Sequence, residues 1–470
     1  MSVAYHLAGG LTQNQLQECQ DLAKSILSEI GLRIDHEEIL AFLSRQKGAR
    51  VEGGRVFYDG DLFEKCLKDQ RQQNADYVWQ WPDEKDFTLR PAYMCLNVYD
   101  AIGGGMHRST TDDLIRAAKL CDSYDMAGPS PVHPQNAPVA LRQIITSRIC
   151  IENSRAVGKW MVVGDIEELR CICGMSRLAG RTPPYVVLQI TISPLKLNAE
   201  YLDIIWRLRD SPELAGDVTI GGGSIPMLGA TGPLSLPAAW TQAAAEAIGA
   251  YITAKLINPR VLGNVCFQVF PFDMRGLGIT MGTPEGALSR LVGKQIQEKL
   301  FSRTMAATFA SMGLPLDPQS TAERMSNVLV EALAGSRVFY DAGMAPIDDM
   351  FCPEQVVLDH EIVKWIQRFM RGMEFEGDKE KILGAIREGM ADGGFFMQEW
   401  TLRHRDFYWT PELFSYMTLS GYMAEKRKTL VERAREIADE RIRSHHFRLP
   451  QDALAGIERV FEATAEKLAK

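Results

Sequence analysis

Seven aromatic side chains are expected at or just after the ends of predicted strands. They are Tyr99, Trp160, Phe270, Phe272, Phe339, Tyr340 and Phe351. The face of an aromatic ring carries partial negative charge, so several such faces together attract an alkylated ammonium group. Aromatic residues beside strands also pack in protein cores, which is the alternative for each ring alone. As a set, they indicate a pocket for a quaternary ammonium ligand.

A glycine triplet lies in the segment TIGGGSIPMLGATGPLSLP, residues 219–237, between a short β-branched run and a helix of small residues. Glycine allows a ligand or another backbone to approach closely. The triplet has neither the GxGxxG spacing of a dinucleotide site nor the GK[ST] ending of a phosphate loop. The backbone amides of Gly222, Gly223 and Ser224 are therefore candidate ligand donors, and a tight turn without a ligand is the alternative.

Further polar residues could contact a ligand. His133 lies in the turn-rich loop GPSPVHPQNAP, where it could serve the site or only the loop. A substrate carboxylate would need hydrogen-bond donors, and the candidates are Asn153, Arg155, Gln189 and Asn264. Each of these could equally make a structural hydrogen bond. An alternative function, a lyase or hydrolase, would need carboxylates for acid–base catalysis, and the candidates are Asp100, Asp273, Asp348 and Asp349.

Nucleophile and metal motifs are missing from the sequence. It contains no GxSxG elbow and no closely spaced histidines on one helix face. His445 and His446 are adjacent, so on a helix they point about 100° apart, and an exposed polar end is expected there. Nine scattered cysteines indicate buried thiols. No metal ligand is predicted.

The elements that would position these residues alternate between strand and helix. Between about residues 93 and 400, short apolar runs such as 94–99, 156–163 and 261–270 are separated by helical segments. This alternation predicts an α/β protein with a parallel sheet, and a TIM (β/α)8 barrel is favoured over an open sheet. The predicted units are an N-terminal α+β appendage at 1–75, the barrel at 76–400 and a C-terminal helical extension at 401–470.

Composition narrows the possible partners and compartment. The chain has 470 residues, of which 46% are hydrophobic, and its formal net charge is −8 without a block of basic residues, which argues against nucleic-acid binding. The N-terminus has no basic flank and no signal-like apolar run, and no 18-residue apolar stretch follows. A cytoplasmic protein with no membrane contact is expected.

Several ordered segments resemble the trimethylamine methyltransferase family. They are LTQNQLQECQDLAKSILSEIGLRI near the N-terminus, Glu152-Asn153-Ser154, the helix entry at 233–249, Gly282–Leu288, and Gly335–Gly372 with Leu358-Asp359-His360-Glu361. The resemblance covers nearly the whole chain. It implies a TIM-barrel enzyme that moves a methyl group from a methylated amine to cob(I)alamin on a separate corrinoid protein.

The chain departs from the founding branch of that family at one position. The founding branch carries pyrrolysine shortly before the segment that corresponds to 317–323, where this chain has only the ordinary residues Gly313-Leu-Pro-Leu-Asp317. It therefore resembles the non-pyrrolysine branch, whose members demethylate quaternary amines. The resemblance implies glycine betaine as the substrate. Proline betaine, carnitine or another N-methylated amine, and a catalytically inactive barrel that binds a quaternary ammonium, are the alternatives.

The chemistry of a quaternary amine agrees with this interpretation. The nitrogen leaves as a neutral tertiary amine and needs no proton, so the protein mainly orients the substrate and excludes water. No catalytic side chain is predicted, because the reactivity belongs to the corrinoid. The sequence lacks a DxHxxG cobalamin motif, so the corrinoid is expected on a partner protein, with no tightly bound cofactor. The apolar face of residues 450–470 could pack on the barrel or on a second subunit.

Overall fold

Eight parallel strands, each followed by a helix, form the centre of the protein. The computed structural model describes residues 10–76, 87–181, 185–188, 190–215, 218–221, 223–302, 307–309, 311–346, 349–372, 378–424 and 428–468. The parallel strands are β4 (Thr88–Pro91), β7 (Gly128–Pro129), β8 (Val157–Met161), β9 (Tyr185–Val187), β12 (Val218–Gly221), β13 (Leu262–Asn264), β16 (Ala307–Thr308) and β17 (Val338–Ala342). The helices that follow them are α4 (Thr111–Ser123), α5 (Arg142–Asn153), α6 (Ile166–Leu178), α7 (Ala199–Arg207), α9 (Leu236–Ile257), α10 (Pro284–Phe301), α11 (Pro318–Leu333) and α12 (Pro353–Met370).

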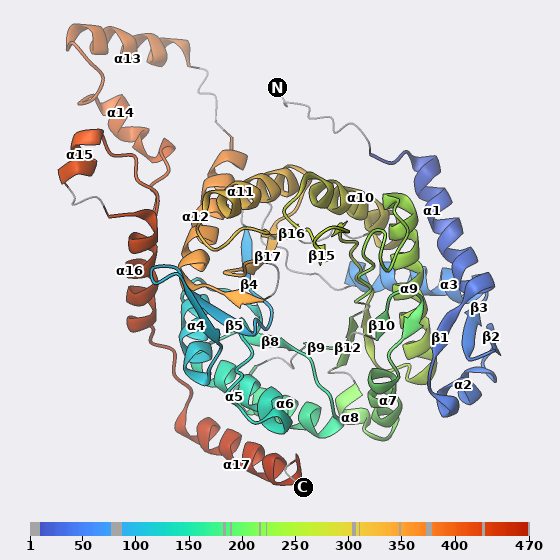
Figure 1. The fold of residues 1–470 in the computed structure, drawn as a ribbon. Coiled ribbons are helices and arrows are strands. Elements are labelled where there is room, and N and C mark those ends of the chain that lie inside the picture. The colour runs from blue at the N-terminus through green and yellow to red at the C-terminus, as the bar shows by residue number, and fades with distance from the viewer. Residues whose placement is uncertain are drawn as a thin grey trace.

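Strand pairing follows the order of the chain. One sheet runs β7-β8-β9-β12-β13, and a second runs β16-β17-β4, so the last parallel strand pairs with the first. The segments that follow β4 and β7 are joined by a parallel bridge between Cys95 and Val132. Among the described residues no ladder joins β13 to β16. Figure 1 shows the helices arranged around these strands. The α/β alternation predicted from sequence is confirmed.

Local sequence signals explain where several of these helices begin. Helices α4, α10 and α11 start directly after Thr110, Thr283 and Asp317, whose side chains each accept a backbone N–H of the first turn. In α10 and α11 the next residue is proline, which suits the first helical position because that N–H has no partner in the helix. These caps fix the helix starts that face the carboxyl ends of the strands.

The N-terminal segment forms a small sheet with helices on it. Its elements are α1 (Gln13–Ser25), β1 (Leu32–Ile34), α2 (Glu37–Leu43), β2 (Ala49–Glu52), β3 (Arg55–Tyr58) and α3 (Gly60–Asp76). Strands β2 and β3 pair as a hairpin whose turn contains Gly53 and Gly54. Strand β1 also pairs in parallel with β11 (Lys196–Leu197), which forms a hairpin with β10 (Thr191–Ile192) after β9. The segment is thus hydrogen-bonded to the central part of the chain.

Helix α9 lies between this segment and the strands. Nearly all its residues are buried, and both the strand β13 and the helices α1, α2 and α3 contact it. A helix covered on all sides must be apolar or small around its whole circumference. The alanine-rich sequence AAWTQAAAEAIGAYITA meets that requirement. Gly249 is needed there because a Cβ would come within 2.4 Å of Cδ1 of Leu32.

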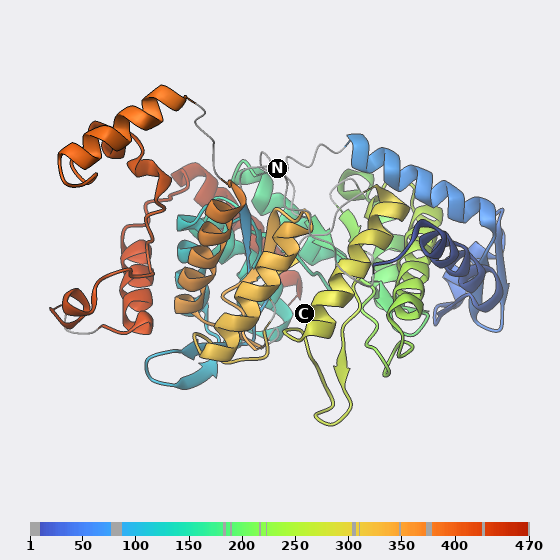
Figure 2. The ribbon, with the colours of Figure 1, turned by 90° about the horizontal axis from the view of Figure 1, so that it is seen from above.

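Two hairpins leave the carboxyl-end side of the strands. They are β5 (Asn97–Asp100) with β6 (Gly105–Arg108), and β14 (Phe272–Asp273) with β15 (Gly278–Ile279). Figure 2 shows both projecting in the same direction. The apolar run expected at 94–99 is partly strand: Cys95 makes a parallel bridge with Val132, and β5 begins at Asn97, whereas the preceding parallel strand β4 was not expected. Strand β5 pairs with β6 and with β18 (Met350–Phe351).

The chain ends in helices on the outside of the ring (Figure 1). They are α13 (Lys379–Ala391), α14 (Glu399–Arg403), α15 (Leu419–Ala424), α16 (Leu430–Arg443) and α17 (Gln451–Leu468). Helix α16 packs on α4 and α12, and α17 packs on α6. Between them His445 is buried, with Nε2 2.9 Å from Oδ2 of Asp122, so the exposed end expected from sequence was wrong for His445, whereas His446 is exposed. In the part of the chain that the structure describes, none of the helices has the length and apolarity needed to cross a bilayer.

Candidate active site

The inner face of the first and last strands carries an arginine and a tyrosine. On β4, Leu89 is buried in the core between strands and helices, and Arg90 lies on the opposite face of the strand. The Arg90 guanidinium lies over the ring of Tyr340 on β17, 5.4 Å from its centroid, and donates to the carbonyl of Ala127 at 2.9 Å. Adjacent Phe339 is buried in the core. Because successive side chains of a strand point to opposite faces, Tyr340 lies on the face of β17 opposite to the one that carries Phe339.

A second cation lies near Arg90. Lys159 of β8 is half-buried, and burial together with the positive charges of Arg181 and Arg90 lowers its pKa. Two positive side chains that influence one another within a strand layer create a positive potential there. Anionic groups of a ligand would be attracted to such a place.

His133 directly follows β7. Its backbone N–H donates to Cys95 at 2.9 Å, and its carbonyl accepts from the Ser109 hydroxyl at 2.7 Å. Burial and the charge of Arg142 lower the pKa of the imidazole to about 4, so it is neutral at pH 7. The Nδ1 atom is buried without a hydrogen-bond partner. A neutral ring of this kind can contact a cationic ligand without repelling it.

Tyrosines and a carboxylate that the sequence analysis did not select also lie after the strands. Tyr93 follows β4 and Tyr201 lies in the first turn of α7. Burial raises the pKa of Tyr93, and the nearby Tyr201 raises it further. Glu168, in the first turn of α6, is buried, accepts the N–H of Gly164 at 2.8 Å, and has a pKa raised by burial. Position immediately after a strand was the only sequence signal that could have identified them.

Asp341 is a further residue that the sequence analysis missed. It lies on β17 with φ at 73°, a conformation that is uncommon for residues other than glycine and often marks a functional site. Its carboxylate accepts the hydroxyl of Thr308, at the end of β16, at 2.5 Å. Nothing in the local sequence VFYDAG indicated this backbone geometry.

The aromatic set predicted from sequence is divided by the fold. Phe339 and Phe351 are almost fully buried in the core, where Phe339 packs on Phe87 and Phe309. Phe270 belongs to a small buried cluster with Met281 at the base of the β14–β15 hairpin. Phe272 lies on strand β14 of that hairpin. Tyr99 lies on the β5–β6 hairpin, paired with Met106. Trp160 is on β8 in register with Pro129 and Tyr185, and its side chain is outside the described part.

The glycine-rich loop is attached to α9 by a buried carboxylate. Ser224 is fully buried and its hydroxyl donates to Glu246 at 2.6 Å, so this hydroxyl is used within the protein. The same carboxylate accepts from the Ser193 hydroxyl and the Leu195 N–H. Gly223 is half-buried in this loop. Gln189 and Gly222 lie outside the described residues.

Other predicted polar residues lie elsewhere. Asn153 donates to Ile149 at the end of α5, and Arg155 pairs with Asp122 in the turn that precedes β8. Both therefore lie at the amino ends of the strands, far from His133, which follows β7. Asn264 is the last residue of β13, and its side chain is outside the described part.

The carboxylates proposed for acid–base chemistry have structural partners. Asp100 pairs with Arg435, which lowers its pKa, and Asp273 accepts two turn N–H groups, of Arg275 and Gly276, which lower its pKa. The backbone carbonyl of Asp349 accepts the N–H of Asn97. Asp348 lies outside the described residues. Within the described ranges, no group of three His, Cys, Asp or Glu side chains is placed to hold a metal ion.

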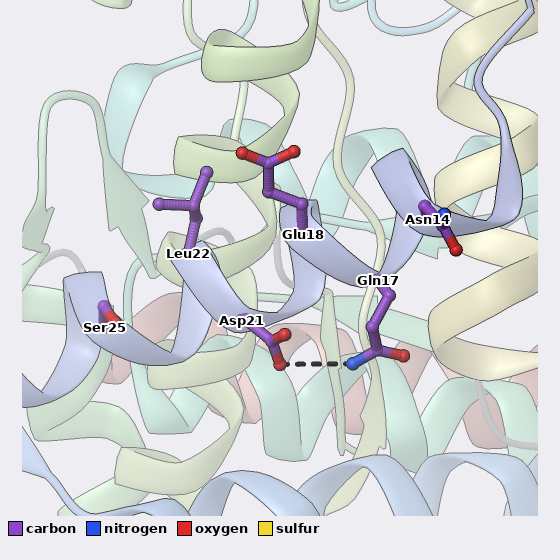
Figure 3. Close-up of a pocket in the computed structure, with 6 residues that line it drawn as sticks. All are labelled: Asn14, Gln17, Glu18, Asp21, Leu22 and Ser25. Carbon is purple, nitrogen blue, oxygen red and sulfur yellow. Dashed lines mark hydrogen bonds between the residues drawn. The ribbon is translucent and has the colours of Figure 1, made fainter.

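A depression of about 410 Å³ on α1 is unrelated to this region. Figure 3 shows that its lining residues, among them Gln17, Glu18 and Leu22, all come from one helix face, and that Gln17 donates to Asp21. The surface is open, and it lies on the N-terminal segment. The carboxyl ends of the parallel strands remain the candidate active site.

Comparison with known proteins identifies the family. A sequence profile described as trimethylamine methyltransferase matches residues 5–453. The chain belongs to the trimethylamine methyltransferase family. This methyltransferase is 24% identical over 437 residues to the glycine betaine methyltransferase of Desulfitobacterium hafniense (strain Y51), with 89% of each chain covered.

Two further relatives are named for other substrates. The L-carnitine:corrinoid methyltransferase of Eubacterium limosum is 24% identical to this methyltransferase over 460 residues, with 91% of each chain covered. A trimethylamine methyltransferase of Methanosarcina mazei is also 24% identical, over 72% of this chain and 69% of its own. The monomethylamine methyltransferase structure of Methanosarcina barkeri aligns with 10% identity and a TM-score of 0.34, covering 97% of both chains, and this similarity is too weak to support an argument.

The arrangement offers two kinds of surface to a substrate of this methyltransferase. Arg90, over the Tyr340 ring, supplies positive charge, and Lys159 is a second cation whose pKa Arg90 lowers. Tyr93 and neutral His133 supply rings without positive charge. A carboxylate would suit the first kind of surface and a methylated cation the second.

Proposed function

We propose that this methyltransferase transfers a methyl group from glycine betaine to the corrinoid of a separate protein and releases dimethylglycine. Membership in the trimethylamine methyltransferase family supports amine-linked methyl transfer, and two of its relatives are named for quaternary amines. The observation that carries the choice of a betaine is the Arg90 guanidinium, which lies over the Tyr340 ring, with Lys159 as a second cation whose pKa is lowered by burial, Arg181 and Arg90. Trimethylamine has no carboxylate for these cations to bind.

We also propose that the eight parallel strands close into a (β/α)8 barrel with the site at their carboxyl ends. The pairing of β17 with β4 and the bridge from Cys95 to Val132 support closure on one side. The units 1–75, 76–400 and 401–470 remain the proposed division of the chain.

The proposed transfer needs no acid or base. The C–N bond breaks with its electron pair kept by nitrogen, so the amine leaves neutral, and the methyl carbon passes to the corrinoid, which supplies the nucleophile. The chain itself would orient the carboxylate through Arg90 and keep the methylated nitrogen against neutral rings. Because positive charge on nitrogen disappears during transfer, neutral rings avoid overstabilising the ground state.

Carnitine and proline betaine are second candidates because each also carries a carboxylate and a quaternary nitrogen. Methylation of cob(I)alamin, followed by visible absorbance, separates them when each is added alone beside glycine betaine and trimethylamine. We expect methyl transfer from glycine betaine. Transfer from trimethylamine alone would contradict the proposal, and binding of glycine betaine without transfer would favour an inactive barrel that binds a quaternary ammonium.

Substitution of Arg90 tests the carboxylate contact. In Arg90→Met we expect the KM for glycine betaine to rise roughly ten- to hundredfold, because a charge-assisted hydrogen bond contributes about 1.5–3 kcal/mol. Arg337→Met is the matched control, since Arg337 also stacks on a ring, Phe87, and donates to backbone carbonyls, but it precedes β17. Arg90→Lys should restore part of the affinity. Equal KM values in the Arg90→Met and Arg337→Met variants would contradict the role of Arg90.

A further inference from the structure

Exposed apolar side chains are concentrated in one segment. Residues 378–424, here named the arm, contain α13, α14 and α15 and make up a tenth of the chain. Of the 29 exposed large hydrophobic residues in the described part of the chain, 13 lie in the arm. They are Ile386, Met390, Phe395, Phe396, Met397, Leu402, Phe407, Tyr408, Tyr416, Met417, Leu419, Tyr422 and Met423. Apolar surface concentrated in this way marks an interaction site.

The arm has no core of its own. Its only buried residues are Gly389, Gln398 and Leu413. Both polar atoms of the buried Gln398 amide lack a hydrogen-bond partner. Its helices have 13, 5 and 6 residues, lengths that are marginal for an isolated helix in water. Figures 1 and 2 show α13 standing away from the ring of helices. The arm therefore needs a surface to cover it.

The second half of the arm is attached to the rest of the chain by several hydrogen bonds. The Glu361 carboxylate on α12 accepts the N–H groups of residues 412–414, at 3.2, 3.0 and 2.7 Å. Arg368 donates to the carbonyl of Phe407 and lies over its ring. The apolar surface continues from the arm onto α12, where exposed Phe369 stacks on Trp365 at 5.8 Å. The arm is thus attached beside an exposed apolar residue of α12.

The total surface is large enough for a stable interface. A compact monomer of 52.5 kDa is expected to expose about 18,000 Å², about 5,000 Å² less than the 23144 Å² of this chain. Obligate homodimers bury roughly 2,000–5,000 Å² in total, and their interfaces are more apolar than those of transient complexes. Each subunit of such a dimer contributes about half of that total, roughly 1,000–2,500 Å², so the excess on one chain is more than large enough for a permanent partner to cover part of it.

We propose that the arm packs against a second copy of this chain, in a two-fold interface built from residues 378–424 and the last turn of α12. A second copy is always present at the concentration of the chain itself, so it can cover the arm continuously. The arm also has mixed charge, with seven Asp or Glu and five Lys or Arg residues, so no charged surface is required of the partner. In a two-fold interface each arm covers the other subunit.

Light scattering after size-exclusion chromatography of the full chain tests this proposal. We expect a mass of at least twice 52.5 kDa at micromolar concentration. The double substitution Phe396→Lys with Met397→Lys, at side chains that are 84% and 80% exposed in the isolated chain, should weaken association at least tenfold. The control is Leu22→Lys with Leu333→Lys, at exposed positions outside the arm, and it should associate like the wild type.

Crosslinking of mixed light and heavy isotope-labelled wild-type chains gives a readout that needs no variant. We expect crosslinks between light and heavy chains within 378–424. A wild-type mass of 52.5 kDa would overturn the proposal, as would interchain crosslinks that avoid the arm, or an arm variant that associates like the control. Protection of arm amides from hydrogen exchange only after a corrinoid protein is added would also overturn it and would assign the arm to that partner.

Discussion

At the scale of single residues, burial sets the charge state of the candidate site. His133 is held neutral because its imidazole is buried near Arg142, and Lys159 has a lowered pKa because it is buried near two other cations. Glu168 has a raised pKa because its carboxylate is buried. Each of these shifts favours the neutral form of its group relative to the same group in water. A site that releases a neutral amine from a cation benefits from such surroundings.

His133 gives a testable dependence of stability on pH. Its pKa is about 4 in the folded protein and near 6.5 in an unfolded chain, so the unfolded state binds more protons between these values. Stability is therefore fully present above pH 6.5 and falls as the pH decreases toward 4. We expect His133→Gln to reduce this loss by about 2 kcal/mol when urea unfolding is compared at pH 7 and pH 4.5. Parallel curves for the two proteins would contradict the assignment.

At the scale of elements, α9 holds the loops after two strands. The Glu246 carboxylate accepts four hydrogen bonds, from Ser193, Leu195, Ser224 and Gln242. They connect the glycine-rich loop after β12 with the turn between β10 and β11. Buried carboxylates with several donors are fixed in position, and so are the donors. This arrangement gives the helix a role in shaping the candidate site.

Substitution of Glu246 separates positioning from stability. In Glu246→Gln one acceptor oxygen becomes an NH₂ group that faces donors, so we expect a loss of about 2–4 kcal/mol of stability. We also expect kcat/KM for the methylated amine to fall at least tenfold, because Ser224 and its loop shift. Asp122→Asn is the control, since Asp122 is equally buried but pairs with Arg155 and His445. It should lose stability and keep kcat/KM within about twofold; similar losses of kcat/KM in both variants would contradict the positioning role.

At the scale of the whole molecule, the N-terminal segment and the strands share one core. Trp240 and Ile248 of α9 belong to the same buried cluster as Leu27 and Leu32 of the N-terminal segment. Strand β1 adds a parallel ladder to β11. We infer that the segment unfolds together with the centre of the molecule and not as a separate unit.

A double-mutant cycle across this contact tests the coupling. We expect Gly249→Ala to cost about 1–3 kcal/mol, because the new Cβ would overlap Cδ1 of Leu32. Leu32→Ala alone should cost about 2–5 kcal/mol through the cavity it leaves. The double variant should be less destabilised than the sum by at least about 0.5 kcal/mol, since the new methyl group enters that cavity. Additive values from urea unfolding would show that the helix and β1 are not packed as described.

The amino-acid sequence alone determined the alternation of strands and helices and the small, apolar character of α9. These are local properties: period, caps and residue volume act within one element. The sequence also identified His133 as a candidate, because turn residues surround it. It did not distinguish Phe339 from Tyr340, since which face of a strand meets the helices depends on register.

Only the tertiary structure decided which residues come together. Arg90, Lys159 and Tyr340 lie far apart in the sequence, and the pairing of the last strand with the first brings β17 beside β4. Asn153, which looked equivalent to His133, lies at the opposite ends of the strands. The buried pair of His445 and Asp122 likewise joins segments more than 300 residues apart. Long-range packing sets burial, burial sets pKa, and neither can be obtained from the order of residues along the chain.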